Sequence, residues 1–213
     1  MFEVLEREAL NSTVTRIRVA APLIAKKAEP GQFVILRTGE ESERLPLTIA
    51  DYDRTAGTIT LIFQVLGHGT MELNALAVGD SLRDLVGPLG KATETEGLHK
   101  VCVVGGGVGS AIALPIAKKL HEQGATVHSV IGFRTRDLVI LESEFRAVSD
   151  EMHLLTDDGT YGEKGLVTAA LEALINAGNQ YDEVIAIGPL VMMKFVSLTT
   201  KKYGVKTVVS MNP

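Results

Sequence analysis

Residues 101–110 are Val-Cys-Val-Val-Gly-Gly-Gly-Val-Gly-Ser. The short apolar run predicts a buried strand, and residues 110–123 have the apolar spacing of a helix. Glycines between a strand and a helix permit a tight turn and let a pyrophosphate approach the backbone, and the free N–H groups at the helix start attract the anion. The segment therefore predicts a nucleotide-binding loop formed by Gly105, Gly106, Gly107, Val108 and Gly109. Its spacing departs from the G-x-G-x-x-G fingerprint, and a glycine turn needed only for packing is the alternative.

The residues that follow this loop alternate between short apolar runs and segments of helical periodicity, which is the βαβ pattern. We expect strands at 101–104, 126–132, 152–156, 184–187 and 206–209, and helices at 110–123, 143–148, 166–177 and 191–203. Five parallel strands joined by right-handed crossovers make a doubly wound sheet. The pattern predicts a five-stranded, nucleotide-binding α/β domain over residues 97–213.

The end of the second predicted strand bears on which nucleotide binds. Residues 133–137 are Phe-Arg-Thr-Arg-Asp, and a doubly wound sheet selects the adenosine ribose at this point. Asp137 offers an acceptor to a ribose hydroxyl, whereas Arg134 and Arg136 suit a 2′-phosphate or stacking on adenine. NADH and NADPH both stay open, and a solvated charged loop is the alternative, more so for Arg136.

Two more segments lie at the carboxyl ends of predicted strands, where open α/β sheets bind ligands. One contains Asp158 in a sequence typical of an Asx turn. In the other, Gly188 and Pro189 follow the fourth strand and Met192 continues into a helix, so that this backbone is a candidate to face a nicotinamide ring. A loop that serves structure, with Met192 packed in the core, is the alternative.

The N-terminal half has a different pattern, in which β-rich runs are separated by turn residues. The clearest runs are 13–19, 32–37, 58–66 and 81–86, and the convincing helical stretch is 70–76. Short strands at such spacing predict a barrel or a sandwich. We expect an all-β domain over residues 1–96, with the boundary in the polar segment 93–99.

Two segments of this half combine anion-binding groups with backbone constraint. Arg44 offers a bidentate fork to phosphate oxygens and Thr48 a hydroxyl donor, while Gly69 and Thr70 begin a helix whose N-terminus could bind a second phosphate. The candidate residues are Arg44, Leu45, Pro46, Leu47, Thr48, Gly67, Gly69 and Thr70.

Composition excludes several classes of protein. The 213 residues have a formal net charge of −5, and the Lys and Arg residues are scattered, so we expect no nucleic-acid partner. The apolar runs are far shorter than the roughly 20 residues of a membrane-spanning helix, and the N-terminus has no secretory pattern, so we expect a cytoplasmic protein without a membrane span. Cys102 is the single cysteine, which excludes a disulfide within the chain and a cysteine-ligated metal site.

These motifs together resemble the ferredoxin–NADP reductase superfamily, in the branch of the dihydroorotate dehydrogenase electron-transfer subunit and the small subunits of ferredoxin:NADP oxidoreductase and sulfide dehydrogenase. The resemblance covers the whole chain, in the family's order. It implies that residues 1–96 form an antiparallel β-barrel that binds FAD. Arg44 is then implied at the pyrophosphate, Thr48 near flavin N5, and Gly67, Gly69 and Thr70 at a second phosphate segment. It also implies NAD(H) or NADP(H) on the glycine loop, on the segment of Asp158, and at Gly188, Pro189 and Met192.

Two departures from the family pattern matter. Ile187 stands where the family has a cysteine before Gly-Pro, so no thiol is available there, although the flavin supplies the redox chemistry without it. Proteins of this branch continue past the Met-Asn-Pro at residues 211–213 into a cysteine-rich segment that binds a [2Fe–2S] cluster. With Cys102 alone, such a cluster is expected only if the native chain extends past Pro213.

We therefore expect an FAD-dependent oxidoreductase that moves a hydride between NAD(P)H and FAD and passes electrons to a larger redox subunit. No protein side chain needs to act as nucleophile or base. A stand-alone NAD(P)H:flavin reductase and a non-catalytic nucleotide-binding regulatory module are the alternatives. The sequence leaves open the terminal acceptor, the direction of electron flow and the oligomeric state.

Overall fold

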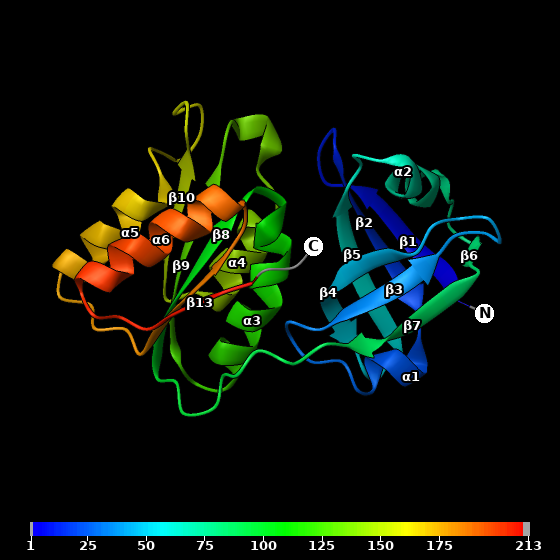
Figure 1. Cartoon of the computed structure of the whole chain (residues 1–213), viewed down its shortest axis with the longest axis horizontal. Helices are drawn as coiled ribbons and strands as arrows, with labels where there is room; N and C mark the ends of the chain where they lie inside the picture. Colours follow the sequence, from blue (N-terminus) through cyan, green and yellow to red (C-terminus); the bar gives the residue numbers. More distant parts are fainter. Residues whose placement is uncertain (1, 211–213) are drawn as a thin grey trace. The chain divides into compact units, whose positions relative to one another are not determined.

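The computed structural model describes residues 2–210, so Met211, Asn212 and Pro213 lie outside the described residues. The described chain divides into two compact units, one ending at Thr93 and the other beginning at Glu94 (Figure 1). The first unit is an antiparallel β-barrel and the second an α/β unit with a parallel sheet, which confirms the expected fold class.

The first unit has one seven-stranded antiparallel sheet in the order β6-β1-β2-β5-β4-β3-β7. Its edge strands β6 and β7 are consecutive and separated only by Arg83, so the two edges of the sheet meet in a nearly closed barrel. Its elements are β1 (Phe2–Ala9), β2 (Val14–Ala20), α1 (Pro22–Ala25), β3 (Phe33–Arg37), β4 (Leu45–Asp53), β5 (Thr58–Gln64), α2 (His68–Ala75), β6 (Ser81–Leu82) and β7 (Asp84–Leu89).

The barrel core follows from alternation along the strands. On β2, Ile17 and Val19 point inward, and on β5 Ile59, Leu61 and Phe63 do so, because successive side chains of a strand face opposite sides. The short helix α1, a single turn that begins at a proline, was not expected, whereas α2 lies where the sequence predicted it. Figure 1 shows α1 and α2 at opposite ends of the barrel.

Strand β1 shows how pairing can establish a strand that its own sequence does not clearly predict. It has one fully buried side chain, Val4, and four charged residues that face solvent. Its backbone pairs with β2 in a register that sets Val4 opposite Val19. The hydrogen-bond ladder, rather than an apolar face, therefore holds most of this strand in place.

The second unit has a parallel sheet in the order β11-β10-β9-β8-β12-β13. All five expected strands are present, and the two-residue strand β11 extends one edge. Its elements are β8 (Lys100–Gly106), η1 (Gly107–Gly109), α3 (Ser110–Glu122), β9 (Thr126–Phe133), η2 (Arg136–Leu138), α4 (Glu142–Val148), β10 (Glu151–Thr156), β11 (Glu163–Lys164), α5 (Val167–Asn176), β12 (Glu183–Ile187), α6 (Leu190–Lys202) and β13 (Thr207–Val209).

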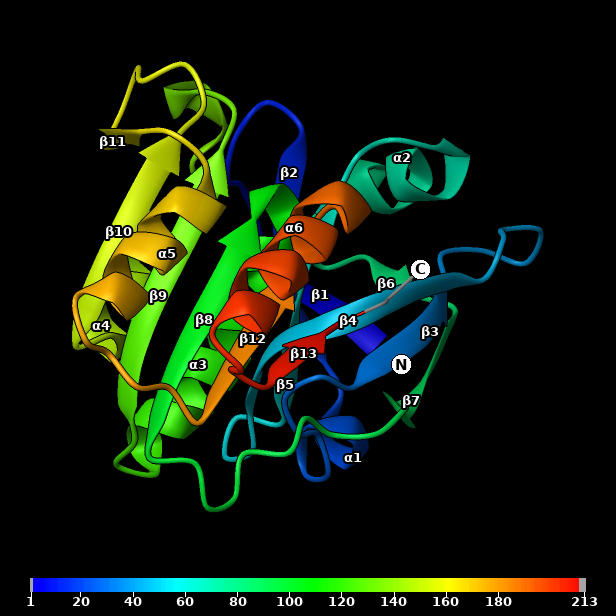
Figure 2. The same cartoon turned by 60° about the vertical axis from the view of Figure 1, so that its left-hand side comes forward.

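Helices cover both faces of this sheet, so the strands between them read as continuous apolar runs. Figure 2 shows α5 and α6 in front of the sheet and α3 and α4 behind it. The helix after β8 returns to β9, whereas β12 lies on the other side of β8. The strand order therefore reverses between β8 and β12, which is where doubly wound sheets bind ligands at their carboxyl ends.

Two histidines on neighbouring strands, His128 on β9 and His153 on β10, have pKa values that are shifted in opposite directions. Burial lowers the pKa of His128, whose Nδ1 is 2.8 Å from the Tyr181 hydroxyl. Burial also acts on His153, but its ring nitrogens lie 3.0 Å from Glu151 Oε1 and 2.7 Å from Glu163 Oε1. These carboxylates outweigh the burial and raise the pKa of His153 above its usual value.

We expect His153→Gln to destabilise the protein more at about pH 6 than at about pH 8.5. A histidine with a raised folded-state pKa contributes stability that is present below its unfolded pKa of about 6.5 and lost as pH rises through the folded pKa. Urea unfolding of both proteins at the two pH values measures this difference. His128 is present in both proteins, and its pKa is lowered mainly by its own burial with a smaller effect of His153, so its contribution changes little. An equal loss at both pH values would contradict the expectation.

Candidate functional site

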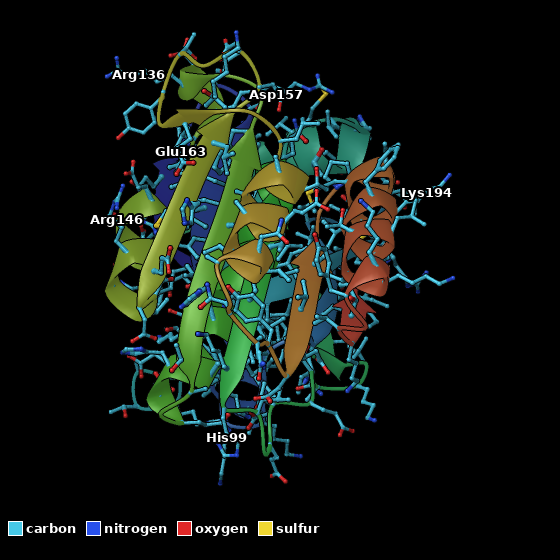
Figure 3. All side chains as sticks on the ribbon, turned by 90° about the vertical axis from the view of Figure 1, so that its left-hand side faces the viewer. His99, Arg136, Arg146, Asp157, Glu163 and Lys194 are labelled. Atoms are coloured by element: carbon cyan, nitrogen blue, oxygen red, sulfur yellow. The ribbon has the colours of Figure 1, made fainter. Side chains whose placement is uncertain are left out.

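The loops that follow the parallel strands lie together along the carboxyl edge of the sheet, where the strands end. The glycine loop follows β8, the Gly188 segment follows β12, and the loops after β9 and β10 contain Arg134 and Asp158. Figure 3 shows Arg136 and Asp157 at this end and His99, which precedes β8, at the opposite end. The structure therefore places every candidate residue of this half at one edge.

The glycine loop and the Gly188 segment are packed against each other. A Cβ atom added to Gly109 would lie 2.6 Å from the Ile187 carbonyl oxygen and 2.7 Å from Gly188 Cα. A Cβ on Gly188 would lie 3.0 Å from Gly106 Cα, and one on Gly106 would collide with Met192 Sδ. Only residues without a side chain allow this approach, so these glycines join the two motifs predicted separately.

The start of α3 fits an anionic group. Its first turn has no acidic side chain, so its N–H groups and dipole are not offset locally. Ser110, the first residue of α3, has a buried hydroxyl with no hydrogen-bond partner among the described residues. Gly107, with φ +55°, has open space where a Cβ would be. A pyrophosphate therefore fits this turn by charge and by room, although packing accounts for Gly106 and Gly109.

The loops after β9 and β10 run side by side. The Asp157 N–H donates to the Phe133 carbonyl at 3.0 Å, and the Asp158 N–H to the Arg134 carbonyl at 3.3 Å. The Arg134 side chain is exposed and makes no hydrogen bond or ion pair in residues 2–210. Asp158 accepts from the N–H and hydroxyl of Thr160, and these bonds lower its pKa. Asp158 thus closes an Asx turn beside an available arginine.

One aromatic contact at this edge was missed by the sequence analysis. The guanidinium of Arg136 lies over the ring of Tyr161, 5.6 Å from its centroid, and the Tyr161 hydroxyl donates to Glu142 at 2.8 Å. Glu142 also pairs with Arg146 at 2.7 Å. Tyr161, an aromatic residue in a polar loop after a strand, was the available indication. Arg136 is consequently held by the protein, whereas Arg134 is not.

In the barrel unit, the first FAD candidate segment lies on β4. Leu45, Pro46, Leu47 and Thr48 pair with β3, and Thr48 lies opposite Phe33. Arg44 directly precedes the strand, is exposed, and makes no hydrogen bond or ion pair within the described part of the chain. A cation on a rigid strand end is therefore available to a phosphate.

The second candidate segment forms the start of α2. The Thr70 hydroxyl accepts from the N–H groups of Leu66 and Gly67, each at 3.0 Å, so it caps the helix. The Gly69 N–H donates to Glu43 Oε1 at 2.7 Å. Glu43, which the sequence analysis did not select, thereby brings the two candidate segments together. An anion already occupies one N–H group of this helix start, which shows that the position accepts negative charge.

Residues 2–210 show neither a cluster of metal ligands nor a helix that could span a membrane. These residues contain no group of three or more His, Cys, Asp and Glu side chains arranged to hold a metal ion. Cys102 is buried on β8, and burial raises the pKa of its thiol, so it stays protonated. No helix in this range is long and apolar enough to cross a membrane.

Known proteins resemble the chain along its length, although no protein-family model matches it. The dihydroorotate dehydrogenase B (NAD(+)) electron transfer subunit homolog of Thermotoga maritima is 42% identical over 96% of this chain and 75% of its own length. The dihydroorotate dehydrogenase B (NAD(+)) electron transfer subunit of Geobacillus thermodenitrificans is 33% identical over 90% and 75%. The chain thus spans about three quarters of these relatives.

Solved structures also match the chain along its length. The structure of an NADH-dependent reduced ferredoxin-NADP oxidoreductase, studied for flavin-based electron bifurcation, matches all of this chain and 76% of its own, with a TM-score of 0.93 and 39% identity. The ferredoxin reductase of carbazole 1,9a-dioxygenase has the same fold at 19% identity, with a TM-score of 0.81 over 98% of this chain and 68% of its own.

The fold and these matches define an NAD(P)H-dependent flavoprotein oxidoreductase of the electron-transfer class. Within the ferredoxin–NADP reductase superfamily, the chain belongs to the family of dihydroorotate dehydrogenase B electron transfer subunits and their homologs. The expected family and reaction class are confirmed.

We expect Gly109→Ala to lower the free energy of unfolding by about 1–3 kcal/mol, because its methyl group would force Gly188 away. The φ of Gly109 is −59°, so alanine adopts the backbone without strain and the effect is one of contact. Urea unfolding measures it. Gly67→Ala, whose Cβ meets nothing within 4 Å, is the control, and it should cost only about 0.5 kcal/mol because alanine is a poorer N-cap of α2 than glycine. Equal stability of the two variants would contradict the close approach.

Proposed function

We propose that the barrel unit binds FAD, that the α/β unit binds NAD(H), and that the chain passes electrons to a larger partner subunit. The functional halves are residues 1–96 and 97–213. The observation that supports this best is the packing of the glycine loop against the Gly188 segment at the point where the strand order reverses. This arrangement offers a pyrophosphate site and a nicotinamide site side by side on one rigid edge.

Each nucleotide segment has a distinct task in this proposal. The turn at Gly107 and the start of α3 bind the pyrophosphate, and the backbone at Gly188 and Pro189 positions the nicotinamide. Met192 packs under the loop, where its sulfur approaches Gly106. Arg134 and Asp158 lie at the adenosine end. NAD(H) is favoured over NADP(H) by the curated relatives whose names specify NAD(+).

The flavin segments fit FAD by charge. Arg44 would bind a phosphate from the start of β4, and the N–H groups at the start of α2, near Gly67 and Gly69, would bind another. Thr48, farther along β4, would lie near flavin N5. A bound flavin supplies the redox chemistry, taking up a hydride equivalent and releasing electrons singly. The protein residues bind, orient and exclude water, and none acts as a covalent catalyst.

A larger redox subunit completes the proposal, because the curated relatives are named as electron transfer subunits. A [2Fe–2S] cluster would take part only if the native chain extends past Pro213, since four thiolates are not present in these residues. A cytoplasmic location is proposed with it.

The function is tested by the colour of the purified protein after incubation with FAD. The protein should retain yellow flavin, and anaerobic NADH should bleach the flavin absorbance band faster than NADPH does. A protein that binds no FAD would refute the proposal. Nucleotide binding without flavin reduction would favour the regulatory module, and turnover of free FMN with weak FAD retention would favour the stand-alone flavin reductase.

We expect Arg44→Ala to weaken FAD binding by about 10- to 100-fold, because a charge-assisted contact to phosphate contributes about 1.5–3 kcal/mol. Quenching of flavin fluorescence measures the affinity. Arg54→Ala is the control, since Arg54 lies on the same unit but pairs with Glu29, and its affinity for FAD should equal that of the wild type. Equal weakening in both variants would indicate a general charge effect and refute the assignment of Arg44.

A further inference from the structure

The carboxylate of Glu43 contacts a backbone N–H group at the start of α2, where the proposed function places an FAD phosphate. Its Oε1 accepts the Gly69 N–H at 2.7 Å, and Gly69 is the second residue of the eight-residue helix α2. The first turn of α2 has no acidic side chain of its own. Glu43, from the segment before β4, therefore supplies the negative charge that the helix start favours.

The approach of Glu43 depends on the absence of a side chain at residue 69. A Cβ on Gly69 would collide with Glu43 Oε1 and would lie 2.8 Å from Glu43 Cγ and 2.7 Å from Leu45 Cδ2. The glycine that would let a phosphate reach the helix is thus the one over which Glu43 lies. One N–H group cannot donate fully to the carboxylate and to a phosphate oxygen at the same time.

We propose that Glu43 is an internal competitor of the FAD diphosphate, so that its carboxylate must leave the Gly69 N–H when FAD binds and thereby limits how tightly FAD is held. This inference rests on the proposed function, because it takes FAD as the ligand of the α2 start. The charges agree with it, since a carboxylate that stayed beside the diphosphate would repel it.

The surroundings of Glu43 allow such an exchange. The Glu43 residue is exposed, so its side chain can turn into solvent without leaving a buried cavity. Its neighbour Ser42 is held by the Gly39 N–H at 3.0 Å and the Thr38 hydroxyl at 2.7 Å. These bonds tether the loop next to Glu43 through Ser42 and do not involve the Glu43 side chain. Arg44, which makes no ion pair with Glu43, remains available to the incoming phosphate.

The test compares FAD affinity of the flavin-free full chain with that of Glu43→Gln. Glutamine keeps the size and the acceptor but removes the charge. We expect FAD to bind about 3- to 10-fold more tightly to the variant, which corresponds to the contribution of a charge at a helix start. Flavin fluorescence is the readout, since the chain has no tryptophan whose emission could report binding instead. Riboflavin, which has no phosphate, should bind both proteins equally.

The matched control is Glu41→Gln. Glu41 is also exposed and lies in the same loop, two residues before Glu43, so this variant removes the same charge at a nearby position. Its FAD affinity should stay within about twofold of the wild type. An equal gain in both variants would mean that net charge alone acts, and would overturn the proposal.

Stability provides a second readout that separates competition from a purely structural role. Loss of the carboxylate should lower the unfolding temperature of flavin-free Glu43→Gln slightly while FAD affinity rises. If Glu43 had only a structural role, the substitution would lower both the unfolding temperature and the FAD affinity. Unchanged or weaker FAD binding by Glu43→Gln overturns the competition but leaves the proposed function standing, whereas failure of the wild type to bind FAD overturns both.

Discussion

The second unit depends on the close approach of two turns at the point where its strand order reverses. The turn after β8 and the turn after β12 come together because Gly106, Gly109 and Gly188 have no side chains to separate them. The register of β8 and β12, which sets Gly105 beside Ile187, continues directly into this contact. Any residue with a Cβ at these positions would part the turns and with them the starts of α3 and α6. Packing therefore accounts for Gly106, Gly109 and Gly188, whereas the open turn at Gly107 is the part of the loop with room for the proposed pyrophosphate.

The two candidate phosphate sites, at the starts of α3 and α2, differ in the charged side chains that lie beside them. The start of α3 has no acidic side chain in its first turn and has a buried hydroxyl without a partner. The start of α2 is compensated from outside the helix by Glu43, while Arg44 beside it stays unpaired among the described residues. A helix start with no carboxylate beside it can bind an anion directly. At a helix start that already contacts a carboxylate, an incoming anion must displace that carboxylate. The proposed FAD and NAD(H) phosphate sites are therefore expected to differ in how readily they accept a phosphate.

Much of the fold could be predicted because local patterns and packing agree. The alternation of β2 and β5, the apolar run of β8 and the periodicity of α3 are each visible within a few residues. Strand β1 could be predicted only weakly, since Val4 is its one fully buried residue and its pairing partner supplies the remaining stability. The edge strand β11 has two exposed residues, and its existence depends on the neighbouring β10.

The sequence by itself determined the α/β unit and, through resemblance, the flavin family, because glycine turns and apolar periodicity are local properties. The nucleotide-binding role of the glycine loop stays a prediction. Only the tertiary structure decided that the Gly188 segment packs on the glycine loop, that Tyr161 holds Arg136 while Arg134 stays available, and that Glu43 lies on the Gly69 N–H. Glu43 and Gly69 are 26 residues apart, and Arg136 and Tyr161 belong to loops after different strands. Such contacts depend on strand order and register, which no short stretch of residues specifies.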